Sequence, residues 1–316
     1  MGDRTGIAWT DASWNPVRGC TRVSPGCVHC YAETVAARFS GPGQPYQGLA
    51  QWVTRPGGER EARWTGKLAF VETMLDQPLR WRRPRRIFVN SMSDLFHEAM
   101  PDEWIDRVFA IMALAPQHVF QVLTKRPERA RAYLASLPAT GAPDRLTRIA
   151  ARIGAETRGY RGSAGLVDRP LPNVWLGVSV EDQARADERI PILLDTPAAV
   201  RWISAEPLLG PLDLDRWLPY SQHWRQAEPS RASLGLPCLE WVVIGGESGP
   251  GARPFTLGWG KDLIRQCRAG SAAVFMKQVG SVPVNREGER CPHIRDLKGG
   301  DPAEWPEELR VREWPR

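Results

Sequence analysis

The sequence predicts a mixed α/β protein built on a parallel sheet, as a full or partial (β/α) barrel of the TIM type. Short, nearly continuous apolar runs recur along the chain, and such runs are typical of strands that are buried on both faces. Stretches of helical character separate them, and this alternation indicates a parallel sheet. With a strand just before Cys20, the chain holds about seven strand–helix units, which suits one barrel domain.

The order of the elements follows from local composition. Residues 100–109 predict a helix, because Pro101 and two acids precede apolar residues at three-to-four spacing. The apolar runs predicted to be strands lie at 86–90, 118–123, 174–179, 200–204, 241–245 and 273–276. We expect a single domain over residues 1–316, with irregular loops or insertions where Gly, Pro, Arg or Ser are abundant, near 39–66, 138–172 and 219–237.

Composition limits the class of protein. With 42% hydrophobic residues and 14 tryptophans in 316 residues, the chain can bury a sizeable core, which excludes global disorder. No apolar run reaches the length of a membrane span and the N-terminus lacks a secretory signal, so we expect a cytoplasmic protein without a membrane partner. The formal charge of +6 permits a polyanionic partner.

The most specific motif is a cysteine-rich loop. Cys20, Cys27 and Cys30 lie within eleven residues, with the turn residues Pro25 and Gly26 between them. Three thiolates suit a 4Fe-4S cluster that leaves one iron open to a small molecule such as S-adenosylmethionine. Structural zinc requires four ligands, and it remains an alternative in which a distant cysteine or histidine completes the site. Unliganded cysteines are the other alternative.

Polar residues also follow several predicted strands. In a parallel barrel the carboxyl ends of the strands gather on one face, so these residues are candidates for a common site, although ordinary helix capping would also place polar residues there. The Gly-rich stretch 245–251 lacks the phosphate-binding patterns and predicts a close backbone approach to a ligand or a tight turn. The strand-end residues are Asn90, Ser91, Ser93 and Asp94; Thr124, Lys125 and Arg126; Ser179 and Glu181; Ser204 and Glu206; and Glu247 and Ser248.

Six segments together resemble the phage-associated three-cysteine-motif family, which is itself similar to radical S-adenosylmethionine enzymes such as spore photoproduct lyase. They are residues 19–32, 88–97, 121–127, 175–181, 203–208 and 245–250. The resemblance covers most of the chain and implies a radical-enzyme barrel, a 4Fe-4S cluster and an electron donor. It also implies reductive cleavage of S-adenosylmethionine to a 5′-deoxyadenosyl radical. One departure is that six residues separate Cys20 from Cys27, where the common loop has three.

The resemblance also implies roles for residues at the strand ends. The strand-end pattern itself predicts that Asp94, Lys125, Ser179 and Glu181 line one cavity above the cysteine loop, because a parallel barrel gathers these ends on one face. A hydrogen-atom donor thiol is an option for Cys238, Cys267 or Cys291, and a buried apolar role is the alternative, best supported for Cys267. By this likeness Ser91, Ser93 and Asp94 bind the methionyl ammonium, and Lys125 binds the methionyl carboxylate. Ser179 and Glu181 bind the ribose. Glu206 closes the pocket, and Tyr31 lies near the adenine.

A basic segment suggests the partner. Residues 79–86 hold five arginines and one tryptophan. Arginine binds phosphate in a bidentate manner and indole stacks on bases, so we expect a nucleic acid substrate, with DNA favoured over RNA. The alternative for this segment is a solvated connection without a binding role. For the function there are two alternatives: a radical enzyme with a peptide or small-molecule substrate, and a non-enzymatic zinc-stabilised nucleic-acid-binding protein. The residues are Arg80, Trp81, Arg82, Arg83, Arg85 and Arg86.

Overall fold

The computed structural model describes residues 5–137, 144–157, 160, 169–220 and 230–315. The chain forms two compact units, which we describe separately. The first unit comprises residues 1–175 and 197–199, and the second comprises residues 176–196 and 200–316. The sequence expectation of one domain over residues 1–316 stays a prediction.

The main sheet has seven strands, which are hydrogen-bonded in the order β1-β6-β7-β8-β9-β10-β12. The pairs β1–β6, β6–β7, β9–β10 and β10–β12 are all parallel. This confirms the predicted mixed α/β class, and the open strand order fits a partial barrel. The strands are β1 (Ala12–Trp14), β6 (Arg86–Val89), β7 (Val119–Thr124), β8 (Val174–Ser179), β9 (Val200–Ala205), β10 (Trp241–Gly245) and β12 (Ala273–Gln278).

In the first unit, helices follow the strands as the sequence predicts. Helix α4 (Asp102–Leu114) begins after Pro101, with Asp102 and Glu103 in its first turn, where acids are favoured by the helix dipole. Its buried face includes Ile105 and Phe109. The remaining helices of this unit are α1 (Tyr31–Arg38), α2 (Glu72–Leu75), α3 (Gln77–Arg80), α5 (Pro127–Ala135) and α6 (Arg145–Glu156).

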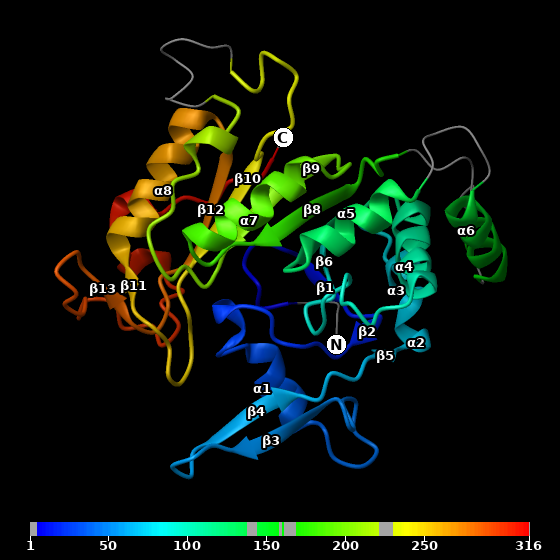
Figure 1. The fold of residues 1–316 in the computed structure, drawn as a ribbon, viewed down its shortest axis with the longest axis horizontal. Coiled ribbons are helices and arrows are strands. Elements are labelled where there is room, and N and C mark those ends of the chain that lie inside the picture. The colour runs from blue at the N-terminus through cyan, green and yellow to red at the C-terminus, as the bar shows by residue number, and fades with distance from the viewer. Residues whose placement is uncertain (1–4, 138–143, 158–159, 161–168, 221–229, 316) are drawn as a thin grey trace. The chain divides into compact units, whose positions relative to one another are not determined.

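Two of the stretches expected to be irregular contain regular structure. Residues 39–66 include an antiparallel hairpin of β3 (Ala50–Thr54) and β4 (Arg60–Trp64), which lies beside α1 (Figure 1). Small residues on both sides, including Ala36, Ala50 and Ala62, allow the close packing of helix on hairpin. Within 138–172, Asp144 is the N-cap of helix α6, and its carboxylate accepts a hydrogen bond from the amide of Thr147 at 2.8 Å.

The second unit contains α7 (Gln183–Leu194) and α8 (Leu257–Gly270) with β9, β10 and β12. Trp202 and Trp241, both fully buried, stack with ring centroids 5.0 Å apart. In the Gly-rich stretch a close approach is made to the protein's own backbone, because a Cβ at Gly246 would lie 2.5 Å from the carbonyl oxygen of Val279. Its glycines therefore serve backbone packing here.

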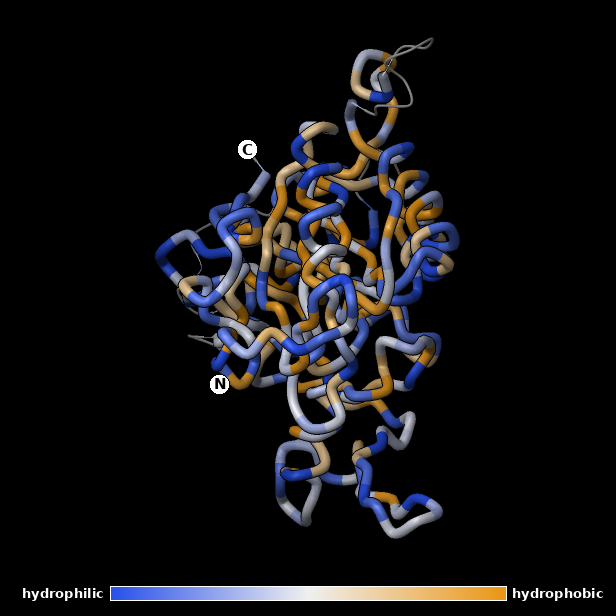
Figure 2. Tube along the Cα trace, turned by 90° about the vertical axis from the view of Figure 1, so that its left-hand side faces the viewer, coloured by the Kyte–Doolittle hydropathy of each residue, from blue (hydrophilic) through white to orange (hydrophobic). Residues whose placement is uncertain are grey.

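Short strand pairs complete the described part of the chain. They are β2 (Val17–Arg18) with β5 (Ala69–Phe70), and β11 (Phe255–Thr256) with β13 (Pro283–Val284). Hydrophobic residues are concentrated in the interior segments, and the outer loops are largely hydrophilic (Figure 2). Among the described helices, none combines the length and the apolar character that crossing a membrane requires.

Candidate functional site

The three motif cysteines lie on the connection between β2 and α1. Gly19 opens this loop with a φ of +98°, and a Cβ there would lie 2.1 Å from the carbonyl oxygen of Lys67. Only glycine fits both constraints. Cys27 ends a short 3-10 turn and Cys30 is the N-cap of α1. All three are free thiols on partly exposed residues.

The charge state of these thiols depends on burial. Burial and the neighbouring carboxylate of Asp94 raise the pKa of Cys20 to about 12, and burial also raises the pKa of Cys30. Cys30 contributes to the raised pKa of Cys20, and Cys27 to that of Cys30, so the three thiols lie close enough to interact electrostatically. Cys20 and Cys30 are therefore protonated at neutral pH, and a metal that binds them must displace their protons.

As placed, the thiols do not form a preassembled metal site. Over the described part of the chain, no group of three or more His, Cys, Asp or Glu side chains is arranged to hold a metal ion. The donors nevertheless fit a thiolate-ligated centre in number and in kind, because three free cysteines share one loop. The loop would have to close around such a centre as it binds.

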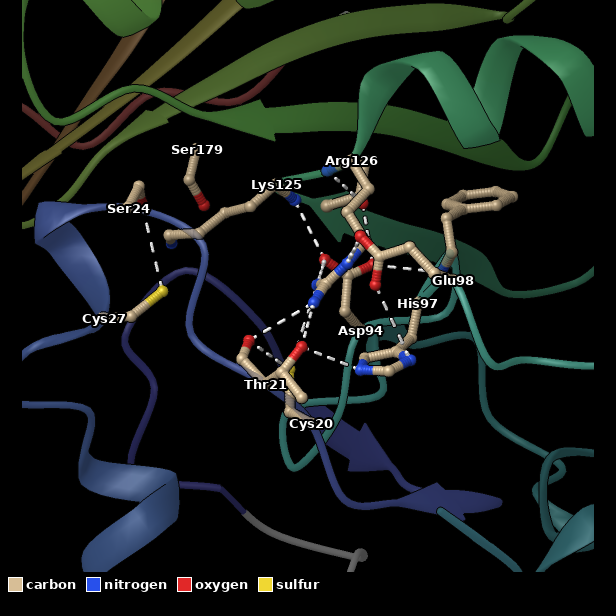
Figure 3. A network of polar contacts seen from close by, with 12 residues as sticks. Cys20, Thr21, Ser24, Cys27, Asp94, His97, Glu98, Lys125, Arg126 and Ser179 are labelled. Atoms are coloured by element: carbon tan, nitrogen blue, oxygen red, sulfur yellow. Dashed lines mark hydrogen bonds and ion pairs between the residues drawn. The ribbon is translucent and has the colours of Figure 1, made fainter. Parts of the chain in front are cut away.

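Arg126 joins the start of the cysteine loop to the end of β7 (Figure 3). Its guanidinium is buried, with 5% of the side chain exposed, and forms an ion pair with Asp94 at 3.0 Å. It also donates to the side-chain oxygen of Thr21 at 2.8 Å and to Glu98 at 2.7 Å. The neighbouring acids outweigh its burial and raise the pKa of Arg126 further, so it remains a cation.

Asp94 is the acceptor at the centre of this network. One carboxylate oxygen accepts from the hydroxyl of Thr124 at 2.7 Å and from the amide of Phe96 at 3.0 Å. The other accepts from the amide of Lys125 at 3.0 Å and from Arg126. Both oxygens are thus engaged by protein donors, and the predicted role at a methionyl ammonium would require some of these bonds to be exchanged.

His97 fixes the position of Thr21 from another direction. Its Nδ1 accepts a hydrogen bond from the amide of Ala99 at 3.1 Å, so its Nε2 carries the proton and donates to the hydroxyl of Thr21 at 2.9 Å. Burial, and then the positive charge of Arg126, lower the pKa of His97. A neutral imidazole therefore supports the loop.

The other predicted residues of the first unit surround this loop. Ser93 donates to the carbonyl of Val17 at 3.0 Å, and the hydroxyl of Tyr31 donates to the carbonyl of Ser91 at 3.0 Å. The side chain of Lys125 extends toward the segment that carries Ser24 and Cys27 (Figure 3). The structure thus brings Ser91, Ser93, Asp94, Lys125 and Tyr31 to the neighbourhood of the cysteine loop.

In the second unit, each acidic residue at a strand end has a basic partner. Glu181 is 1% exposed and pairs with Arg189, whose guanidinium also donates to the carbonyl of Ser179 at 2.9 Å. Glu206 pairs with Lys277, and Glu247 with Arg253. The expectation that Ser179 and Glu181 line one cavity with Asp94 and Lys125 stays a prediction.

The basic segment divides into exposed and paired residues. Arg82 and Arg83 are exposed, whereas Arg80 pairs with Asp76 and Arg86 with Asp11. Arg85 lies over the indole of Trp81 at 4.8 Å. Trp81 is only 8% exposed and its indole also packs edge-on against His118, so stacking on a base would require it to leave this packing.

Some of these residues were not among the sequence-predicted site residues. These are His97 and Thr21, which lie inside the motif segments, whereas Arg126 was expected as one of the strand-end candidates. The roles of all three depend on contacts between residues far apart in the chain, such as Thr21 and Arg126. Of the remaining cysteines, Cys267 is fully buried and burial raises its pKa to about 12. This matches the apolar role suggested for Cys267.

Comparison with known proteins gives one match. A family model described as "Protein of unknown function (DUF5131)" matches residues 4–306. Neither the curated proteins nor the solved structures gave a match. The match spans nearly the entire chain of 316 residues, and the chain therefore belongs to this family.

Proposed function

We propose that this chain is a radical S-adenosylmethionine enzyme in which Cys20, Cys27 and Cys30 hold a 4Fe-4S cluster. The observation that carries the proposal is the presence of three free thiols on one loop, tied by buried Arg126 to the carboxyl end of β7. Carboxyl ends of parallel strands are where barrel enzymes place their chemistry. The resemblance of the motif segments to radical enzymes supports the same assignment.

The chemistry of the bound group is reductive. A 4Fe-4S cluster held by Cys20, Cys27 and Cys30 would supply one-electron reduction of S-adenosylmethionine to methionine and a 5′-deoxyadenosyl radical, with the electron coming from an external donor protein. The chain itself binds and orients. Lys125, which extends toward the cysteine loop (Figure 3), would bind the methionyl carboxylate, and Ser91, Ser93 and Tyr31 would provide polar contacts beside it. Ser179, Glu181 and Glu206 keep their predicted roles at the ribose and the pocket wall.

We propose nucleic acid as the substrate, with DNA favoured over RNA, through lesion repair or base modification. Support comes from the exposed Arg82 and Arg83 and from the positive net charge of +6. Exposed arginines can neutralise phosphates and release condensed counterions. Because Trp81 is packed within the protein, phosphate contact by the exposed arginines is better supported for this segment than base stacking by Trp81.

Anaerobic reconstitution tests the cluster. Wild-type protein supplied with iron and sulfide should take up about four irons per chain, as a 4Fe-4S cluster requires, and its electron paramagnetic signal should change when S-adenosylmethionine is added. With a chemical reductant it should release 5′-deoxyadenosine and methionine.

Serine variants supply the matched control. Cys20→Ser, Cys27→Ser and Cys30→Ser should each lower iron content, whereas Cys238→Ser, in the second unit, should retain it. Stoichiometric zinc with no iron uptake would contradict the proposal and favour the zinc-stabilised binding protein. Iron uptake without cleavage of S-adenosylmethionine would contradict the proposed radical activity but would agree with the proposed cluster.

A further inference from the structure

Arg126 makes several contacts with the cysteine loop that its own helix does not need in order to fold. A guanidinium carries five N–H donors, and here Nε donates to Glu98 at 2.7 Å and Nη1 to Asp94 at 3.0 Å. Nη1 also donates to the sulfur of Cys20 at 3.9 Å. Nη2 donates to both the carbonyl and the hydroxyl of Thr21, at 3.2 and 2.8 Å. The fork is thus fully used, and three of its five contacts reach residues 20 and 21.

The orientation of this fork is itself fixed. The amide of Arg126 donates to the hydroxyl of Thr124 at 2.9 Å, and that hydroxyl donates to Asp94 at 2.7 Å. Asp94 in turn accepts from Arg126. This closed circuit holds the guanidinium at the end of β7 in one orientation, because Thr124, Asp94 and Arg126 are all buried and each is hydrogen-bonded to the other two.

Cys20 lies between two fixed points. On its N-terminal side the amide of Gly19 donates to the carbonyl of Met92 at 3.1 Å. On its C-terminal side Thr21 is held by Arg126 and by His97. The direction of the Cys20 sulfur therefore follows from contacts on both sides. Cys27, by comparison, has a 3.9 Å contact with the hydroxyl of Ser24 inside the same loop.

We propose that Arg126 is a positioning residue that orients Cys20 as a ligand and, through its N–H···S contact, raises the reduction potential of the bound cluster. The second part rests on the proposed function. A nearby cation and an N–H donor to a ligand sulfur favour the more negative, reduced state of a cluster, and such hydrogen bonds are a known determinant of potential. A lysine keeps the charge but cannot span five acceptors.

Thiol labelling of metal-free protein tests the positioning role alone. We would compare wild type, Arg126→Gln, Arg126→Lys and a control, Arg129→Gln, which removes the ion pair between Arg129 of α5 and Asp102 of α4. Iodoacetamide modification is followed at each cysteine by peptide mass spectrometry. Arg126→Gln should label Cys20 roughly tenfold faster, corresponding to local opening that is easier by about 1.4 kcal/mol.

The controls separate loop release from unfolding. Buried Cys267 should remain unlabelled in every folded variant, and Arg129→Gln should label Cys20 at the wild-type rate. If Arg126→Gln does not fold, labelling is measured in Arg126→Lys instead, and we expect Cys20 to be labelled at a rate between those expected for wild type and Arg126→Gln. An unchanged Cys20 rate in a folded Arg126 variant overturns the positioning role.

Potentiometry of the reconstituted protein tests the second part. Relative to wild type, the midpoint potential should shift to more negative values in Arg126→Gln and by a smaller amount in Arg126→Lys, with Arg129→Gln unchanged. If Arg126 has only a structural role, its variants will bind a different amount of cluster, but the cluster that they bind will have the wild-type midpoint potential. That result overturns the proposal. If wild type binds no cluster, the proposed function fails, while the labelling result still decides whether Arg126 positions Cys20.

Discussion

At the scale of single residues, the acids that follow the strands are each matched with a cation from within the same unit. Such pairing satisfies buried carboxylates, whose isolation would be costly. It also means that a ligand would meet fixed dipoles and ion pairs in place of free carboxylates. The pairs are Asp94–Arg126, Glu181–Arg189, Glu206–Lys277 and Glu247–Arg253.

His97 gives a prediction on pH at this scale. Because burial and Arg126 lower its pKa in the folded protein, the unfolded chain binds a proton more readily. Stability contributed by neutral His97 is therefore complete above about pH 6.5, the ordinary histidine pKa, and is lost as the pH falls toward the folded value. His97→Gln, which can keep a donor to Thr21, should show a flatter decline.

Urea unfolding between pH 5 and pH 8, read as the free energy of unfolding, measures this difference. The comparison at pH 8 is the control, because both proteins are then uncharged at residue 97. Parallel stability profiles for wild type and His97→Gln would show that His97 makes no such contribution.

At the scale of elements, packing within the second unit depends on one missing side chain. Gly177 of β8 faces the indole of Trp202 on β9, and a Cβ at residue 177 would lie 2.4 Å from that ring. Trp202 is fully buried against Trp241, so it cannot move away without disturbing the core. Glycine in this strand therefore has a packing role.

Gly177→Ala should accordingly lower the free energy of unfolding by about 1–3 kcal/mol, the usual cost of overpacking a core. The matched control is Gly210→Ala, because no atom lies within 4 Å of the added methyl group there. Denaturant midpoints of both variants measure the effect. Equal midpoints for Gly177→Ala and wild type would contradict the packing argument.

At the scale of the whole molecule, charge is the property that bears on the partner. The net charge of +6 is modest for 316 residues, so a polyanion would be bound through local clusters of arginine. Arg82 and Arg83 are the exposed members of the basic segment. Other members are drawn into contacts within the chain, such as that of Arg86 with Asp11.

Arg82→Ala/Arg83→Ala should weaken DNA binding and flatten its salt dependence by about one to two units of slope, since each phosphate contact contributes roughly 0.7 to 0.9. Fluorescence anisotropy over a range of salt concentrations measures the slope. Arg265→Ala, at an exposed arginine of α8, serves as the control. A folded double variant with unchanged affinity and slope would remove this segment from the interface and favour a peptide or small-molecule substrate.

Most strands of the main sheet could be predicted from the amino-acid sequence, because burial on both faces requires a continuous apolar run. The predicted strands 174–179 and 241–245 coincide with β8 and β10. The hairpin of β3 and β4 escaped sequence reasoning, since only Ala50 and Ala62 of its strand residues are buried and its stability comes from packing on α1.

The cysteine loop was likewise determined by sequence, because its spacing and turn residues are local. The contacts that hold that loop in place could be found only in the folded chain. Arg126 and Thr21 are 105 positions apart, and their contact exists because parallel strands bring their carboxyl ends to the same edge of the sheet. A linear pattern records which residue types are present, whereas the pairing of buried charges depends on distances that only the folded chain sets.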